Sequence, residues 1–140
     1  MMYFFGVVLY NIYIFYDRVV YGYVFKDFYD ENDVKIHSIL ILSFFQWFNL
    51  CFAILSTIYT VLYKENMPTF AFVLGLILIN IINFRIYYRG GEAFKKFVDN
   101  KPMYFSNKTV SALITIMYIV LTFFLWFLAA QFGRQIITGN

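Results

Sequence analysis

Three long stretches without a charged residue dominate this chain of 140 residues and limit what it can fold into. They cover residues 38–63, 69–84 and 109–133. A helix needs about 20 mostly apolar residues to cross the hydrocarbon core of a bilayer. The first and third stretches reach this length alone, and the second reaches it over 68–88, once its flanking residues are included. The sequence therefore predicts three transmembrane helices, over 38–63, 68–88 and 109–133.

The composition excludes most other classes of protein. Hydrophobic residues make up 62% of the chain and charged residues only 14%, against about 25% charged in an ordinary soluble domain. A soluble domain of this size buries only about two-thirds of the surface that its unfolded chain exposes, so it could not hide this much apolar surface. The segments between the spans are too short to form a soluble catalytic or nucleic-acid-binding domain. We therefore expect an all-α integral membrane protein with a single membrane domain over residues 1–140 and no nucleic acid partner.

The N-terminal segment, residues 1–25, admits two interpretations. Residues 1–16 are free of charge, but Asp17 and Arg18 follow, and a charged side chain at the centre of a bilayer costs about 2.5–3.5 kcal/mol. The segment is also rich in tyrosine, which prefers the headgroup region. It is therefore either a short tilted span over about 1–17 or an amphipathic helix that lies in the interface. The expected bundle has three firm transmembrane helices plus this N-terminal amphipathic or fourth transmembrane helix.

The distribution of positive charge predicts the orientation of the spans. The connector 85–108 carries six basic residues, and we expect it to include a short basic helix over 92–99 that lies on the membrane surface. Placing this connector in the cytoplasm leaves nine of the 11 Lys and Arg residues inside and only Lys64 and Arg134 outside, as the positive-inside rule favours. We therefore expect a multi-pass protein of the inner (cytoplasmic) membrane whose C-terminus lies outside. The connector is expected to contact anionic lipid headgroups or a partner protein through Arg85, Arg89, Lys95, Lys96 and Lys101.

Uncharged polar residues gather on one face of each predicted span. Because lipid offers them no hydrogen bonds, we expect them either to bond across helix–helix contacts or to line a pore shared between copies of an oligomer. The three uncharged stretches contain no ionisable relay of Asp, Glu, Lys, Arg or His, which argues against a proton-coupled small-solute transporter. The candidate helix-interface or pore-lining residues are Ser43, Gln46, Asn49, Thr57, Asn80, Asn83, Thr115 and Thr122.

Residues that could carry chemistry are few and scattered. His37 is the single histidine and Cys51 the single cysteine, whereas a metal site needs several ligands and a nucleophile needs an adjacent base. The acidic residues between 26 and 37 do not follow the spacing of a calcium-binding loop. The sequence therefore predicts no catalytic residue, no metal site and no cofactor, and the protein is not expected to be an enzyme.

Three aromatic-rich segments, YNIYIF at 10–15, SFFQWFNL at 43–50 and NFRIYYRGGEAFKKF at 83–97, resemble those of small uncharacterised bacterial multi-span membrane proteins. That family has a Tyr-rich N-terminal helix, three or four helices and a basic juxtamembrane segment. The resemblance implies a topology and carries no site residues. The expected function is that of a non-enzymatic membrane subunit that oligomerises with its own copies or accompanies another membrane subunit. The alternatives are a pore or membrane-permeabilising effector and a small-solute transporter.

Overall fold

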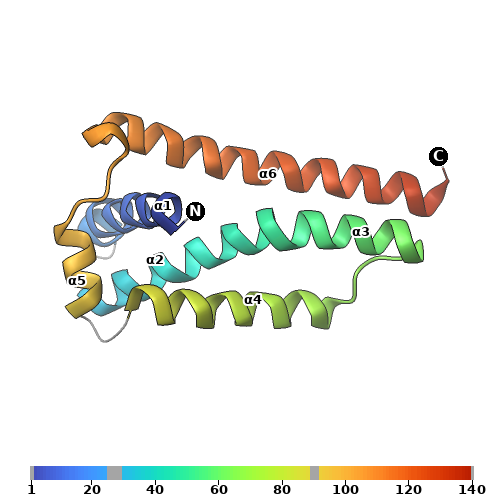
Figure 1. Cartoon of the computed structure of the whole chain (residues 1–140), viewed down its shortest axis with the longest axis horizontal. Helices are drawn as coiled ribbons and strands as arrows, with labels where there is room; N and C mark the ends of the chain where they lie inside the picture. Colours follow the sequence, from blue (N-terminus) through green and yellow to red (C-terminus); the bar gives the residue numbers. More distant parts are fainter. Residues whose placement is uncertain (1, 25–29, 89–91, 140) are drawn as a thin grey trace.

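The computed structural model describes residues 2–24, 30–88 and 92–139, which form helices and no β-strand (Figure 1). Some helices continue one another through wider, π-helical turns, named η1, η3 and η4. The elements are, in order, α1 (Met2–Phe15), η1 (Tyr16–Val24), α2 (Glu31–Gln46), η3 (Trp47–Phe52), α3 (Ala53–Tyr63), α4 (Thr69–Asn83), η4 (Phe84–Tyr88), α5 (Glu92–Asp99), the short 3-10 helix η5 (Tyr104–Ser106) and α6 (Lys108–Thr138).

Three helices are long and apolar enough to cross a membrane, namely Glu31–Tyr63, Thr69–Tyr88 and Lys108–Thr138. This result confirms the prediction of an all-α chain that contains three helices of spanning length. The first and the third helix are longer than the spans predicted over 38–63 and 109–133. Their extra turns lie at the polar ends, where hydrophobicity gives no information on where a helix begins.

Capping side chains set where two of these helices begin. Asp30 accepts a hydrogen bond from the backbone N–H of Asn32 at 2.7 Å. Asn107 accepts hydrogen bonds from the backbone N–H groups of Thr109 and Val110 at 2.9 and 3.2 Å. Each bond satisfies a donor that the first turn of a helix would otherwise leave unpaired. The helix 31–63 therefore begins well before the predicted span over 38–63, whereas α6 begins one residue before its predicted span and extends instead at its C-terminal end, to Thr138.

The long helices run side by side along the length of the molecule (Figure 1). α2 packs against α4, and α3 packs against α6. α5 crosses one end of the bundle, whereas the turn between α3 and α4 lies at the other end, close to the C-terminus (Figure 1). We refer to these as the α5 end and the α3–α4 end.

The helix formed by α1 and η1 lies across the long helices in the half of the molecule near the α5 end (Figure 1). Both of its ends contact that half. The Tyr3 hydroxyl donates to the carbonyl of Met103 at 2.6 Å, and the Tyr21 hydroxyl forms a 3.0 Å hydrogen bond with Nδ1 of His37. α1 packs against both α2 and α6, and residues 5–10 are buried without interruption. A helix that is apolar all round is buried in this way.

The hydrophobic core is built around α1. On the faces that point away from this core, the long helices expose many apolar side chains. Half of the most apolar stretch of the helix 31–63 is buried, against 6% in 69–88 and 11% in 108–138. A soluble monomer rarely exposes so large an apolar surface, which is consistent with a membrane protein. The buried core residues are Phe5, Val8, Leu9, Ile12, Tyr13, Tyr21, Val34, Ile39, Leu42, Tyr87 and Phe94.

Trp47 of η3 is pressed against α4 at Gly75. A Cβ atom at position 75 would occupy the space of the Trp47 indole ring, and Trp47 is almost fully buried. The ring of Phe72, one turn away on α4, also packs on this indole with centroids 5.9 Å apart. Small residues let helices in membranes approach closely, and glycine performs this role at the contact of η3 with α4.

We expect Gly75→Ala to lower the free energy of unfolding by about 1–3 kcal/mol, the usual cost of overpacking a contact. Titration of the protein in detergent micelles with sodium dodecyl sulfate, followed by circular dichroism, measures this change. Gly133→Ala is the control, because the nearest side-chain atom, Cγ2 of Thr60, would lie 4.0 Å from the new Cβ. Equal stability of Gly75→Ala and the wild type would contradict the packing of Trp47 described above.

Candidate functional site

Asn83 forms the polar contact between α4 and α2. Its side-chain amide donates to Oγ of Ser43 at 2.8 Å and to Oε1 of Gln46 at 2.6 Å. Oγ of Ser43 in turn donates to the carbonyl of Ile39 at 2.8 Å. All three polar side chains are buried, so the structure brings three of the predicted residues together in one hydrogen-bonded cluster between two helices.

Asn49 forms a second contact, between η3 and α6. Its side-chain amide donates to Oγ1 of Thr122, and this hydroxyl donates to the carbonyl of Tyr118 on its own helix at 2.8 Å. Asn49 and Thr122 are both buried. Two residues that lie 73 positions apart in the sequence therefore join the middle of the helix 31–63 to the middle of α6.

Asn11 forms a third contact, between α1 and α6. Its side-chain amide lies 3.1 Å from Oγ1 of Thr115 and 3.3 Å from the carbonyl of Ser111, and it also bonds to the carbonyl of Val7 at 3.0 Å. Thr115 was a sequence candidate, but Asn11 was not. Asn11 could have been identified from its position, because it is the one amide side chain in the charge-free run of residues 1–16.

Two of the sequence candidates lie outside these three contacts. The side-chain amide of Asn80 donates to the carbonyl of Leu76 on its own helix at 2.9 Å, and its Oδ1 atom is buried without a hydrogen bond. Thr57 lies instead beside a groove between α3 and α6. The predicted polar residues thus divide into three separate helix contacts and two other environments, rather than forming one continuous stripe.

The groove between α3 and α6, which we call the α3–α6 groove, opens outward from the bundle. Its apolar wall comes from α3 and α6, and its polar side chains include two glutamines on α6 that are exposed. Both glutamines, Gln131 and Gln135, belong to α6, so exposed amide side chains of a helix of spanning length line this groove. The polar residues that line it are Asn49, Thr57, Gln131 and Gln135.

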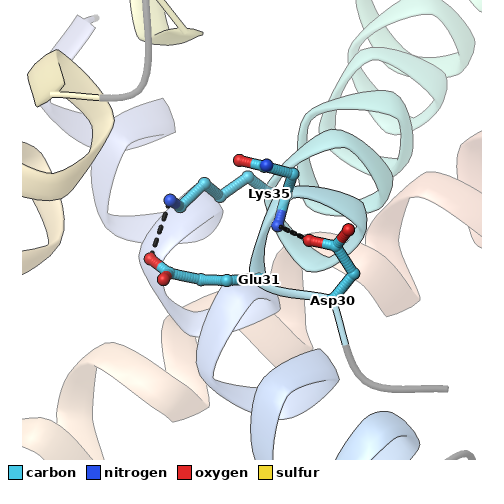
Figure 2. A network of polar contacts seen from close by, with 4 residues as sticks. Asp30, Glu31 and Lys35 are labelled. Atoms are coloured by element: carbon cyan, nitrogen blue, oxygen red, sulfur yellow. Dashed lines mark hydrogen bonds and ion pairs between the residues drawn. The ribbon is translucent and has the colours of Figure 1, made fainter.

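Charged side chains gather at the α5 end, where α2 begins. Figure 2 shows Lys35, whose Nζ atom lies 2.7 Å from Oε1 of Glu31 one helical turn away. Burial, followed by the charges of Asp17 and Glu31, raises the pKa of Tyr13 to about 12. The shift moves this phenol further from ionisation, so the charge at this end of the bundle comes from the carboxylates and the basic residues.

The basic residues predicted to contact lipid or a partner are exposed at the same end. α5 presents its apolar face inward, because Phe94 is fully buried and packs on Tyr13 with ring centroids 5.4 Å apart. Arg89 lies outside the described residues. The exposed basic residues here are Arg85, Lys95, Lys96 and Lys101.

The residues that the structure describes offer no group of three or more His, Cys, Asp or Glu side chains that could hold a metal ion. No protein family, curated protein or solved structure matches this chain.

We expect Asn83→Leu to lower the free energy of unfolding by about 1–2 kcal/mol, because a buried amide that bonds two residues of another helix is lost. Asn80→Leu, three residues earlier, is the matched control. It removes an amide that bonds only its own helix and an oxygen that has no partner, so we expect a change below about 0.5 kcal/mol. Denaturation of each variant in mixed micelles measures its change in the free energy of unfolding.

The double variant Asn83→Leu with Gln46→Leu completes this test. Asn83→Leu leaves Oε1 of Gln46 buried without its donor, and replacing both partners removes that penalty. We therefore expect the double variant to recover part of the lost stability. If Asn83→Leu and Asn80→Leu destabilise the protein equally, the cluster does not hold α2 and α4 together.

Proposed function

We propose that this chain is a non-enzymatic subunit of the inner (cytoplasmic) membrane that associates with a second copy of itself through the α3–α6 groove. The observation that carries this proposal is the presence of Thr57, Gln131 and Gln135 in a groove that opens outward from the bundle. Both glutamines belong to a helix that is apolar enough to cross a membrane. Gln131 lies within the predicted span 109–133, and Gln135 lies two residues beyond its end.

The chemistry of the groove favours another helix as its occupant. Lipid offers no hydrogen-bond partner to a glutamine side chain, so a neighbouring helix that supplies one is stabilising. A carboxamide carries both donors and acceptors. The glutamines of one copy can therefore bond to those of a second copy, as a symmetric interface requires. Ala129 also lines the groove, and small residues allow close approach of helices.

We expect the double variant Gln131→Leu with Gln135→Leu to weaken self-association about 5- to 30-fold, the equivalent of about 1–2 kcal/mol for two interhelical hydrogen bonds. Energy transfer between donor- and acceptor-labelled copies in liposomes, measured at several protein-to-lipid ratios, gives the dissociation constant. Asn80→Leu is the control, because it removes an amide from α4, away from the groove. Unchanged association of the double variant, or a wild-type protein that stays monomeric, would overturn the proposal.

The groove also favours a second candidate function, that of a pore. Two or more copies that meet across it would enclose a path lined by polar side chains. Gln46 and Asn83 bond to each other and so contribute little to such a lining. In liposomes, an ion leak that the double glutamine variant abolishes favours the pore, whereas association without a leak favours the subunit. Asn49 borders the groove, but its amide bonds to Thr122, so the polar lining would consist mainly of Thr57, Gln131 and Gln135.

We further propose that the α5 end faces the cytoplasm and the C-terminus faces the opposite side. The positive-inside rule and the exposed basic residues on and beside α5 support this orientation. The helix of α1 and η1 would then be partly inserted from the cytoplasmic side, since both of its ends contact the α5 half. The basic side chains would lie at the level of the anionic headgroups, which attract each of them by about 1 kcal/mol.

Cysteine labelling tests this orientation. In a Cys51→Ser background, we expect a membrane-impermeant maleimide added to intact cells to label Asn66→Cys but not Lys95→Cys, because the two positions lie at opposite ends of the bundle. Lys95→Cys should react only after the membrane is permeabilised. Labelling of Lys95→Cys in intact cells would reverse the proposed orientation.

A further inference from the structure

A largely apolar cavity of about 630 Å³ lies between the α1–η1 helix, α2 and the first half of α6. This volume falls within the range of about 300–1,000 Å³ that is typical of small-molecule sites. Two polar members of its wall, Asn11 and Thr115, already bond to each other, so the rest of the surface is mainly hydrocarbon. Its apolar wall includes Ile14, Phe15, Ile41, Phe45 and Ile116.

One positively charged side chain, that of Arg18, lies at the edge of this cavity. Arg18 of η1 lines it with an exposed side chain, and no carboxylate among the described residues forms an ion pair with this guanidinium. A guanidinium binds phosphate through two parallel hydrogen bonds. An apolar wall with a single cation at its edge matches a ligand that has a hydrocarbon tail and an anionic head.

We propose that this cavity holds one acyl chain of an anionic phospholipid whose phosphate group lies on Arg18. A helix about 10 Å wide occupies about 420 Å³ per turn, so the cavity holds less than two turns and does not fit a transmembrane helix of a partner. Arg18 lies in the half of the molecule near the basic α5 end, and anionic lipids concentrate in the cytoplasmic leaflet. The inference rests on the proposed membrane location and on the proposed orientation, in which the α5 end faces the cytoplasm, but it does not require self-association.

Native mass spectrometry tests this site. The full-length protein is reconstituted with equal amounts of palmitoyl-oleoyl phosphatidylglycerol and phosphatidylcholine, extracted in detergent and weighed with its retained lipid. We expect one retained phosphatidylglycerol per chain, and Arg18→Gln to lower its preference over phosphatidylcholine about fivefold, the factor for one basic residue near anionic lipid. Arg134→Gln, at the far end of α6, should leave the preference unchanged. Equal retention of the two lipids by the wild type would overturn the proposal.

A second pair of variants tests the acyl-chain part of the site without changing charge. Ile116→Trp places a larger ring in the wall of the cavity, whereas Leu113→Trp adds the same ring on the same helix outside it. The two positions are 56% and 55% exposed, so both substitutions should be tolerated by the fold. We expect Ile116→Trp to release the retained phospholipid and Leu113→Trp to keep it. Equal retention by both variants, or a free fatty acid retained in place of phospholipid, would refute the assignment.

Discussion

Hydrogen bonds between helices are the interactions on which this bundle depends. In the proposed membrane location, apolar side chains gain little by packing on one another, because lipid tails are equally apolar, and polar side chains find no water with which to form hydrogen bonds. Asn83, Asn49 and Asn11 each bond to a residue of a neighbouring helix. Together they connect α4 to α2, η3 to α6 and α1 to α6. Each contact tolerates only one register of its two helices, since a shift of one residue turns the amide away from its partner.

The transverse position of α1 and η1 divides the bundle into two unlike halves. Near the α5 end, α1 fills the space between α2 and α6 and buries most of the core. Towards the α3–α4 end no described helix fills the corresponding place, and the α3–α6 groove opens there. The two proposals follow from this difference. The proposed phospholipid site is the cavity between the α1–η1 helix, α2 and α6. The proposed self-association uses the α3–α6 groove, which lies beyond the reach of α1.

Much of the architecture could be predicted from residue type alone. A run of uncharged apolar residues has few stable alternatives to a helix once water is absent, so three helices of spanning length followed from the three runs. The polar members of those runs were identifiable for the same reason. Their partners were not, because periodicity shows which residues share a face but not which helix that face meets. The pairing of Asn83 with Gln46, and the intrahelical bond of Asn80 three residues away, illustrate this limit.

By itself, the sequence determined that the chain is helical, that three helices are apolar enough to cross a bilayer, and which polar side chains would need partners. These properties depend on local composition and on the 3.6-residue period of the helix. Only the tertiary structure decided that α1 lies across the bundle, that the Trp47 ring packs directly against the backbone at Gly75, and that Gln131 and Gln135 face outward. These features depend on contacts between residues far apart in the chain, whose geometry no local pattern encodes.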